Sequence, residues 1–307
     1  MIGPPSDEDE RPIMTTATAL SEPTFDTSAI DVRPLQPTIG AEIHGIDISQ
    51  PLTAGQRDAI KAAVLRYKVV FFRDQNLDKQ SHAAFARNFG PLYDYPSATS
   101  DSNIVPIHNI SAVEAKKRFA ELEHPDFLKG VIGAGDYYHS DTSWRLVPAW
   151  AAILRAVDLP EVGGDTIWVD ANLAYEGLSD ELKEKLESLH VVHNFQHSIT
   201  RLGHEYPIVA HPAVRTHRET GNKILWVNYS QNPQFLGIEL AESNALLLEV
   251  LRQYKRPEFQ VRFSWKPGSV AFWDNRAAVH YAVRNYGDYP RLLERILVSD
   301  ERLYTDL

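Results

Sequence analysis

The sequence predicts a mainly β protein with flanking helices, in which two antiparallel sheets face each other as a jelly roll. Short apolar runs typical of strands recur between residues 149 and 300, and turn signals such as Pro160–Gly164 and Lys266–Gly268 separate several of them. These runs do not alternate regularly with helices, which disfavours a doubly wound parallel sheet. Many short strands with a few helices beside them are typical of a jelly roll.

The first part of the chain predicts a tail and then the start of one domain. Residues 1–30 are rich in Pro, Ser, Thr, Asp and Glu, which predicts a disordered tail, and residues 31–307 are expected to form a single domain. Within that domain residues 111–136 form a long polar segment, charged and partly helical, directly before the stretch "YYHSDTSW". We expect residues 104–136 to form a lid over the site, with a solvated surface helix as the alternative.

Two helices and a buried strand are predicted before this excursion. The segment "TAGQRDAIKAAVLRYK" predicts a helix that begins at a capping box made by Thr53 and Gln56. The apolar run Val69–Gln75 predicts a buried strand. A second helix is expected over residues 78–90, ended by Gly90 and Pro91.

The remaining elements follow the excursion. Two helices are expected, one over residues 179–189 with Ser179 as its cap and one over residues 240–255. The apolar runs that predict strands cover residues 149–158, 163–170, 223–229, 259–265, 269–275 and 294–300.

Composition excludes several classes of function. The chain has 307 residues, 43% of them apolar, which is enough for a sizeable core, and a net charge of −10, which argues against nucleic-acid binding. It has no cysteine, so thiolate zinc sites and iron–sulfur clusters are excluded. No apolar run approaches the ~18 residues of a membrane span, and the N-terminus lacks an apolar signal core. We expect a cytoplasmic protein that binds neither nucleic acid nor membrane.

The stretch "YYHSDTSW" carries a candidate metal-binding pair. On an extended chain His139 and Asp141 point to the same side, so one cation can bind both. Two imidazoles and one carboxylate on one face of an octahedron hold Fe(II) and leave three positions open. His280, after an apolar strand, is a candidate third ligand. From these residues alone, an ordinary loop pair and a hydrogen-bonded, half-buried core histidine are favoured over a metal site.

A rival cluster lies in "HVVHNFQH". His190, His193 and His197 have spacings that suit one helical face, but the neighbouring apolar residues favour a strand and no carboxylate accompanies them.

Several segments together resemble the taurine dioxygenase (TauD/TfdA) family of Fe(II)/2-oxoglutarate-dependent dioxygenases, over residues 39–300. They are "IGAEIHGIDISQPL", "YKVVFFRDQ", "FARNFGPL", "YHSDTSW", "GGDTIWVDANLAYEGLSDEL", "HPAVRTHRETGNKILWVN" and "WKPGSVAFWDNRAAVHYAVRNYGDYPRLLERILVSDE". The resemblance implies the cupin-like jelly roll called a double-stranded β-helix. It implies Fe(II), 2-oxoglutarate and O₂ as cofactor and cosubstrates, with His139, Asp141 and His280 as iron ligands.

The resemblance also implies roles for three further residues. Arg291 matches the arginine that binds the far carboxylate of 2-oxoglutarate, and Thr166 matches a hydroxyl that assists it; a guanidinium pairs well with a carboxylate. Arg295 lies an even number of residues beyond Arg291 and matches the arginine that binds the anionic group of the substrate. Each residue also has a purely structural alternative. Arg291 could form a surface salt bridge, Thr166 could be an ordinary sheet residue, and Arg295 could be a structural arginine.

Two positions depart from the taurine-cleaving members of the family. Tyr95 stands where those members carry a histidine, and Trp144 stands where they carry a phenylalanine. These residues put taurine in doubt and favour a larger or more aromatic acid, if they contact the substrate rather than only the core. The residues Asp274, Asn275 and Arg276 are candidates for contacts that orient the metal ligands.

The expected function is hydroxylation of a C–H bond in a small carboxylate, sulfonate or sulfate substrate, with release of succinate and CO₂. A natural-product hydroxylase or desaturase of the same family, a non-catalytic jelly-roll binding protein and a zinc hydrolase are the alternatives. The family resemblance favours a homo-oligomer.

Overall fold

The computed structural model describes residues 25–98, 103–108, 137–196, 200, 203–229 and 233–299. Most of the predicted tail (1–30) and most of the predicted lid (104–136) lie outside the described residues. Both therefore stay predictions, as does the single domain over residues 31–307.

The N-terminal elements follow the sequence prediction closely. Helix α1 begins after Thr53, whose side chain forms the predicted capping box with Gln56. The strand predicted over residues 69–75 ends earlier because the chain turns at Asp74, which has a φ of 55°. The elements in this part are β1 (Asp31–Pro34), β2 (Ala41–His44), α1 (Ala54–Tyr67), β3 (Val69–Phe72) and α2 (Lys79–Arg87).

A seven-stranded sheet has the strand order β1-β2-β3-β12-β5-β14-β4. Its strands β2 and β3 are parallel because α1 connects them, and the other neighbours are antiparallel. The strands not yet given are β4 (Val105–His108), β5 (Ala151–Asp158), β12 (Val270–Asp274) and β14 (Leu292–Val298).

A three-stranded antiparallel sheet has the order β11-β6-β13, with β6 (Thr166–Asp170), β11 (Gln260–Phe263) and β13 (Ala278–Ala282). Two pairs of strands complete the β structure: β7 (His190–His193) with β8 (Val209–Pro212), and β9 (Val214–Thr216) with β10 (Lys223–Leu225). The run predicted as a strand over residues 223–229 is thus a strand only at its start.

The two large sheets face each other across a shared apolar core. Phe71 of β3 stacks on Phe263 of β11 with ring centroids 4.0 Å apart, and Trp168 of β6 meets Trp273 of β12 at 5.6 Å. Such aromatic pairs contribute about 0.5–1.5 kcal/mol each beyond the area they bury. Polar side chains of these strands that face inward therefore lie in the space between the two sheets.

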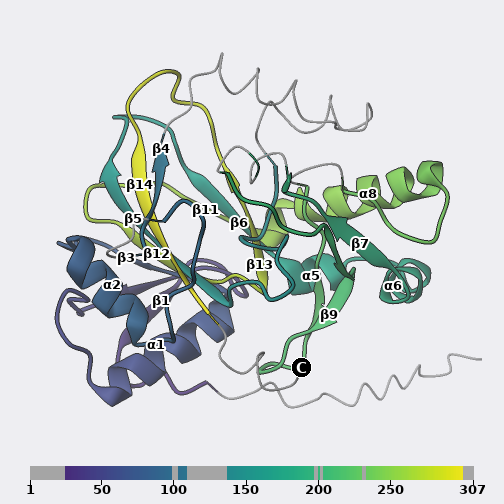
Figure 1. Ribbon diagram of the computed structural model, residues 1–307. Helices are drawn as coiled ribbons and strands as arrows, with labels where there is room; N and C mark the ends of the chain where they lie inside the picture. Colours follow the sequence, from purple (N-terminus) through teal and green to yellow (C-terminus); the bar gives the residue numbers. More distant parts are fainter. Residues whose placement is uncertain are drawn as a thin grey trace, which may run out of the picture.

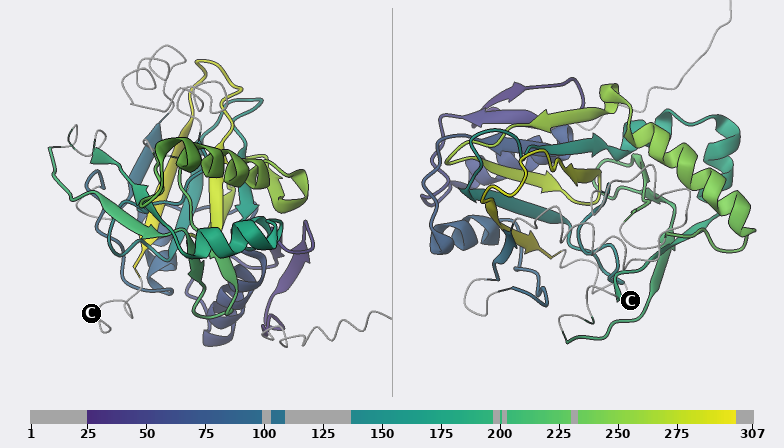
Figure 2. Two further views of the ribbon diagram at one scale, coloured as in Figure 1. Left: turned by 90° about the vertical axis from the view of Figure 1, so that its right-hand side faces the viewer. Right: turned by 90° about the horizontal axis from the view of Figure 1, so that it is seen from above.

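Helices cover the outer faces of both sheets. Buried residues of α1 and α2 pack on the seven-stranded sheet, and residues of α5 (Ala171–Glu176), α6 (Asp180–Glu187) and α8 (Leu240–Tyr254) pack on the other side of the molecule. Figures 1 and 2 show these two groups of helices at opposite ends, with the strands between them. A short 3₁₀ helix, η1 (Pro257–Phe259), leads into β11. The mainly β architecture with flanking helices is confirmed, and α5 is a helix that the sequence did not predict.

Within the described ranges, no helix is both long enough and apolar enough to cross a membrane.

Candidate metal centre

His280 and His139 approach each other through their backbones. The amide of His139 donates to the carbonyl of His280 at 3.0 Å, and the amide of His280 donates back at 2.7 Å. His280 shares a face of β13 with Ala278, which belongs to the core between the sheets. The imidazole of His280 therefore points into the space between the sheets, and the segment around His139 runs along the free edge of β13.

Asp141 completes a cluster with the two histidines. Its Oδ1 lies 3.9 Å from Nε2 of His139 and 4.0 Å from Nε2 of His280. One potential ligand atom of each residue lies within 4.8 Å of the others, so a single cation can contact all three. The structure thus brings together the three residues that the sequence singled out, although 139 positions separate His280 from Asp141 in the chain.

The protonation states suit metal binding. Nδ1 of His139 lies 3.1 Å from the carbonyl oxygen of Tyr137, to which it can donate, and this leaves Nε2 free for a metal. Burial lowers the pKa of His139, against the opposing effect of Asp141, and burial together with the nearby His139 and Arg295 lowers the pKa of His280. Both rings are therefore neutral, as metal ligands must be.

The donor set fits ferrous iron. The Oδ2 of Asp141 is buried and has no hydrogen-bond partner among the described residues. A buried carboxylate oxygen without a partner is costly, and a cation would satisfy it. Two neutral imidazoles and one carboxylate are the ligands that non-haem Fe(II) oxygenases use, with further coordination positions left open.

Asn275 clamps the loop that carries Asp141. Its side-chain oxygen accepts the amide of Asp141 at 2.7 Å, and its Nδ2 donates to the carbonyls of Asp141 at 2.8 Å and Ala149 at 3.0 Å. Thr142, next to Asp141, has a φ of 55°, a conformation that a non-glycine residue holds only under such constraint. The buried amide of Asn275 thus orients the carboxylate ligand.

We predict that Asn275→Ala weakens metal binding about 10- to 100-fold, the range seen when outer contacts to metal ligands are removed. It should also lower the free energy of unfolding by about 2 kcal/mol or more, because buried groups lose their partners. The matched control is Asn172→Ala, which removes a different amide donor, bonded to the Lys223 carbonyl at 2.9 Å. That control should lose stability but keep its affinity for Mn(II) in calorimetric titration. Equal metal affinity in Asn275→Ala and wild type would refute the clamp.

A buried ion-pair network lies beside Asn275. Asp274 accepts hydrogen bonds from Nε2 of His217 at 2.9 Å and from Nη2 of Arg276 at 2.7 Å. Burial alone would raise the pKa of Asp274, but the charges of Arg276 and His217 hold it well below its usual range. Arg276 also pairs with Glu219 at 3.0 Å. The network ties the end of β12 to the turn after β9 and so supports the position of Asn275.

Arg295 lies against the carboxylate of Asp141, a contact that the sequence did not predict. Its Nη1 donates to Oδ1 of Asp141, and both residues are buried. Its Nε is buried without a hydrogen-bond partner among the described residues. The guanidinium carbon lies 5.5 Å from the ring centroid of Tyr95, whose pKa is raised by burial so that its hydroxyl stays protonated.

Arg291 and Thr166 lie near one another at the start of β6. Arg291 directly precedes β14, is buried, and donates from Nε and Nη2 to the carbonyl of Gly164 at 3.2 and 2.9 Å. A Cβ at residue 164 would lie 3.0 Å from Nε of Arg291, so this approach needs a glycine. Thr166, two residues on, accepts from the indole of Trp265 at 3.0 Å. Among the described residues no carboxylate lies within 4.0 Å of Arg291, so its charge is open to an anionic ligand.

Trp144 is part of an aromatic wall beside the cluster. It stacks on Phe195 at 5.7 Å and meets Tyr206 and Tyr95 edge-on at 5.0 and 6.3 Å. Tyr95 in turn faces Arg295. Sequence reasoning missed Phe195 and Tyr206, because no spacing rule links them to Trp144.

The rival histidine cluster does not assemble in the described part of the chain. His190 and His193 lie on β7 at an odd separation, and the first is exposed whereas the second is buried. His197 lies outside the described residues.

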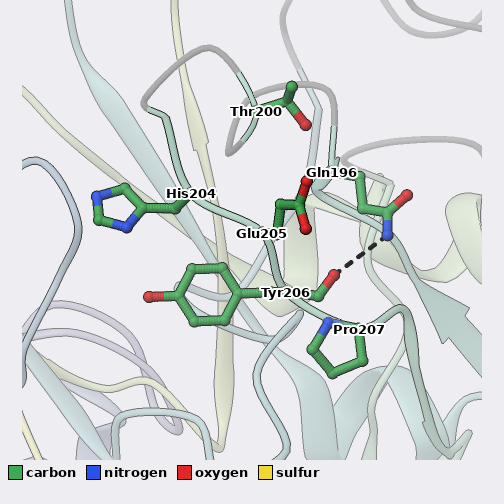
Figure 3. Close-up of a pocket in the computed structure, with 6 residues that line it drawn as sticks. All are labelled: Gln196, Thr200, His204, Glu205, Tyr206 and Pro207. Atoms are coloured by element: carbon green, nitrogen blue, oxygen red, sulfur yellow. Dashed lines mark hydrogen bonds between the residues drawn. The ribbon is translucent and has the colours of Figure 1, made fainter.

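A cavity of about 410 Å³ lies beyond the aromatic wall, lined by Gln196, Thr200, His204, Glu205, Tyr206 and Pro207. Figure 3 shows the rings of His204 and Tyr206 on one side of this segment and the Glu205 side chain on the other, toward Thr200. The cavity adjoins the candidate site through Tyr206, whose ring contacts Trp144.

Comparison with known proteins agrees with this site. The family model described as "Taurine catabolism dioxygenase TauD, TfdA family" matches residues 31–297. An alpha-ketoglutarate-dependent sulfate ester dioxygenase of Pseudomonas putida is 33% identical over 89% of this chain and 90% of its own length. An (S)-phenoxypropionate/alpha-ketoglutarate-dioxygenase of Sphingobium herbicidovorans is 32% identical over 83% of this chain and 89% of its own.

Solved structures resemble the chain over a similar extent. A putative alpha-ketoglutarate-dependent taurine dioxygenase from Burkholderia xenovorans has a TM-score of 0.74 and 36% identity, covering 89% of this chain and 93% of its own. The structure of AAD-2 in complex with Mn(II) and N-oxalylglycine has a TM-score of 0.70 and 28% identity, covering 88% and 97% respectively.

Proposed function

The chain belongs to the TauD/TfdA family of alpha-ketoglutarate-dependent dioxygenases, and on this premise we propose that His139, Asp141 and His280 hold the Fe(II) of its active site. The single observation that carries the proposal is the convergence of these three side chains, with the Oδ2 of Asp141 buried and without a partner among the described residues. When bound, the iron supplies O₂ activation in the presence of 2-oxoglutarate (alpha-ketoglutarate).

The overall reaction is that of a 2-oxoglutarate-dependent dioxygenase. One atom of O₂ enters succinate as 2-oxoglutarate loses CO₂, and the other enters the substrate as a hydroxyl group in place of a C–H hydrogen. If the hydroxylated carbon carries a sulfonate, a sulfate ester or an aryl ether oxygen, the product collapses to a carbonyl and releases that group. Hydroxylation or desaturation without cleavage is the alternative outcome on other substrates.

Arg291 and Thr166 are proposed to bind the far carboxylate of 2-oxoglutarate. Support comes from the buried guanidinium of Arg291, which donates to a backbone carbonyl and has no carboxylate nearby among the described residues. A guanidinium pairs with a carboxylate through two charge-assisted hydrogen bonds, so the ligand would compensate this buried charge. The hydroxyl of Thr166 can donate to the same carboxylate, because its oxygen already accepts from Trp265.

Arg295 and Tyr95 are proposed to bind the anionic group of the substrate beside the metal. Arg295 has a buried Nε available, and Tyr95 keeps its phenolic proton as a second donor. Trp144, which contacts Tyr95, would then form one wall for the body of the substrate. This wall favours an aromatic or long alkyl acid over taurine. Sulfate esters and phenoxyalkanoates, the classes named for the two relatives above, meet that description.

The two facing sheets support a double-stranded β-helix. A cytoplasmic location and a homo-oligomeric state stay predictions from the sequence. A non-catalytic binding protein and a zinc hydrolase are disfavoured, because the ligand set is complete for Fe(II) and the family is one of dioxygenases.

The proposed function is tested with purified protein under anaerobic conditions. Addition of Fe(II) and 2-oxoglutarate should produce a weak visible charge-transfer band. After admission of O₂, a screen of alkyl sulfates, alkanesulfonates and aryloxyalkanoates should find at least one substrate that raises succinate formation in step with its own oxidation. Protein that binds Fe(II) but shows neither the band nor succinate would refute the proposal.

A further inference from the structure

Three arginines near the candidate site differ in what compensates their charge. Arg295 pairs with the carboxylate of Asp141. The charge of Arg291 would be compensated by the far carboxylate of 2-oxoglutarate, as proposed above. Arg145, four residues after Asp141, places its guanidinium near three aromatic rings, and among the described residues no carboxylate lies within 4.0 Å of it.

The guanidinium of Arg145 is enclosed by three rings. Its central carbon lies 4.5 Å from the ring centroid of Tyr206, 5.3 Å from that of Trp144 and 5.6 Å from that of Tyr93. Its Nη1 is buried and lacks a hydrogen-bond partner among the described residues. Ring faces attract the cation, but they are weak acceptors for the N–H groups of the guanidinium. Those donors remain available to an anionic acceptor.

The backbone beside Arg145 is held in place. Nε2 of His211 lies 2.9 Å from the carbonyl oxygen of Ser143 and 3.0 Å from that of Arg145, and can donate to both. Burial lowers the pKa of His211 to about 4, so the ring is neutral and keeps these contacts at neutral pH. The position of Arg145 is therefore built into the fold and does not depend on a free loop.

The aromatic wall joins Arg145 to the metal centre. Trp144 contacts the guanidinium of Arg145, Tyr95 contacts Trp144, and Arg295 contacts Tyr95. A substrate lying along these rings would thus have one cationic group beside the metal and a second at the remote end of the wall. Because Arg295 is proposed to bind the anionic group beside the metal, Arg145 is placed to bind the other end of the substrate.

We propose that Arg145 binds a second anionic group of the substrate, at the end remote from the C–H bond that is oxidised. The inference rests on the proposed function and narrows it: the preferred substrates are dianions with an aromatic or extended apolar body, such as carboxylated aryloxyalkanoates. A charge-assisted hydrogen bond from this half-buried guanidinium contributes about 1.5–3 kcal/mol, which corresponds to roughly a 10- to 100-fold gain in affinity.

The test measures binding in a complex that does not turn over. Protein with Mn(II) and N-oxalylglycine, the pair bound in AAD-2, is titrated by calorimetry at constant ionic strength. The rigid ligand pair is the dianion (4-carboxyphenoxy)acetate and the monoanion (4-carbamoylphenoxy)acetate, in which a neutral amide replaces the ring carboxylate. The flexible pair is the dianion decanedioate and the monoanion 10-hydroxydecanoate. In at least one pair, wild type should bind the dianion about 10-fold or more tightly than the monoanion.

Variants assign this preference to Arg145. Arg145→Gln should reduce the ratio of the two affinities to about 1–2, and Arg145→Lys, which keeps the charge but not the planar fork, should give an intermediate ratio. The control Arg252→Gln changes an arginine that is 66% exposed on α8 and should keep the wild-type ratio. A purely structural role for Arg145 would instead lower the thermal midpoint and leave the ratio unchanged.

The outcomes separate this inference from the proposed function. Wild type that binds both members of each pair alike, or binds none of the four ligands, overturns the role of Arg145, as does a ratio that survives in Arg145→Gln. The proposed function fails independently, if wild type does not bind Mn(II) with N-oxalylglycine or does not consume 2-oxoglutarate with Fe(II) and O₂.

Discussion

His280→Ala should abolish metal binding and 2-oxoglutarate turnover. The substitution removes one of the three proposed ligands, which come from two distant segments, and the remaining pair His139 and Asp141 cannot hold Fe(II) in the same geometry. We expect more than ~100-fold weaker metal binding, beyond the range caused by loss of outer contacts. The measurements are calorimetric titration with Mn(II), the visible band of the Fe(II)–2-oxoglutarate complex, and succinate formation.

His190→Ala is the matched control for this prediction. His190 is exposed on β7 and belongs to the rival histidine cluster, so its removal should leave metal affinity and turnover at the wild-type level. If His190→Ala lost the metal while His280→Ala kept it, the assignment of the metal centre would be wrong. Far-ultraviolet circular dichroism of both variants would check that each remains folded.

Arg291→Gln should raise the concentration of 2-oxoglutarate needed for half-maximal turnover by about 30-fold or more. Removing one partner of a buried, hydrogen-bonded charge pair costs about 2–5 kcal/mol, because the other charge stays buried without compensation. Affinity for N-oxalylglycine in the Mn(II) complex should fall in parallel, while affinity for Mn(II) itself should stay within a few-fold of wild type.

Two further variants distinguish loss of charge from loss of packing. Arg291→Lys keeps the charge but not the forked geometry, so it should recover only part of the affinity. Arg262→Gln changes a half-exposed arginine of β11 that pairs with Asp165 at 2.7 Å, and it should keep 2-oxoglutarate affinity near wild type. Unchanged dependence on 2-oxoglutarate in Arg291→Gln would remove Arg291 from the site.

The local elements and the ligand types could be predicted from the sequence because their causes are local. The capping box of Thr53 and Gln56 sets the start of α1 within a few residues. The apolar runs predict the strands β3, β5, β6, β10, β11, β12 and β14. The even spacing of His139 and Asp141 places both side chains toward one cation. The assignment of His280 needed the family resemblance, since its own surroundings favoured a core histidine.

Contacts between distant segments could not be predicted in this way. The amide of Asn275 meets Asp141 only because β12 ends beside the loop that precedes β5. The pairing of Arg295 with Asp141 depends on β14 packing next to β5, and no spacing in the chain encodes it. The partners of Trp144 and the enclosure of Arg145 arise in the same manner, from segments that approach each other only in the folded chain.

The amino-acid order by itself determined the chemical inventory of this protein: two imidazoles and a carboxylate for a metal, arginines for anions, and much of the secondary structure that carries them. Only the tertiary structure decided that Arg295 pairs with Asp141 and that His280 meets His139. It also placed three aromatic rings around the guanidinium of Arg145. The physical reason is that periodicity and capping act over a few residues, whereas the charge and burial of a site depend on which strands the packed core brings side by side.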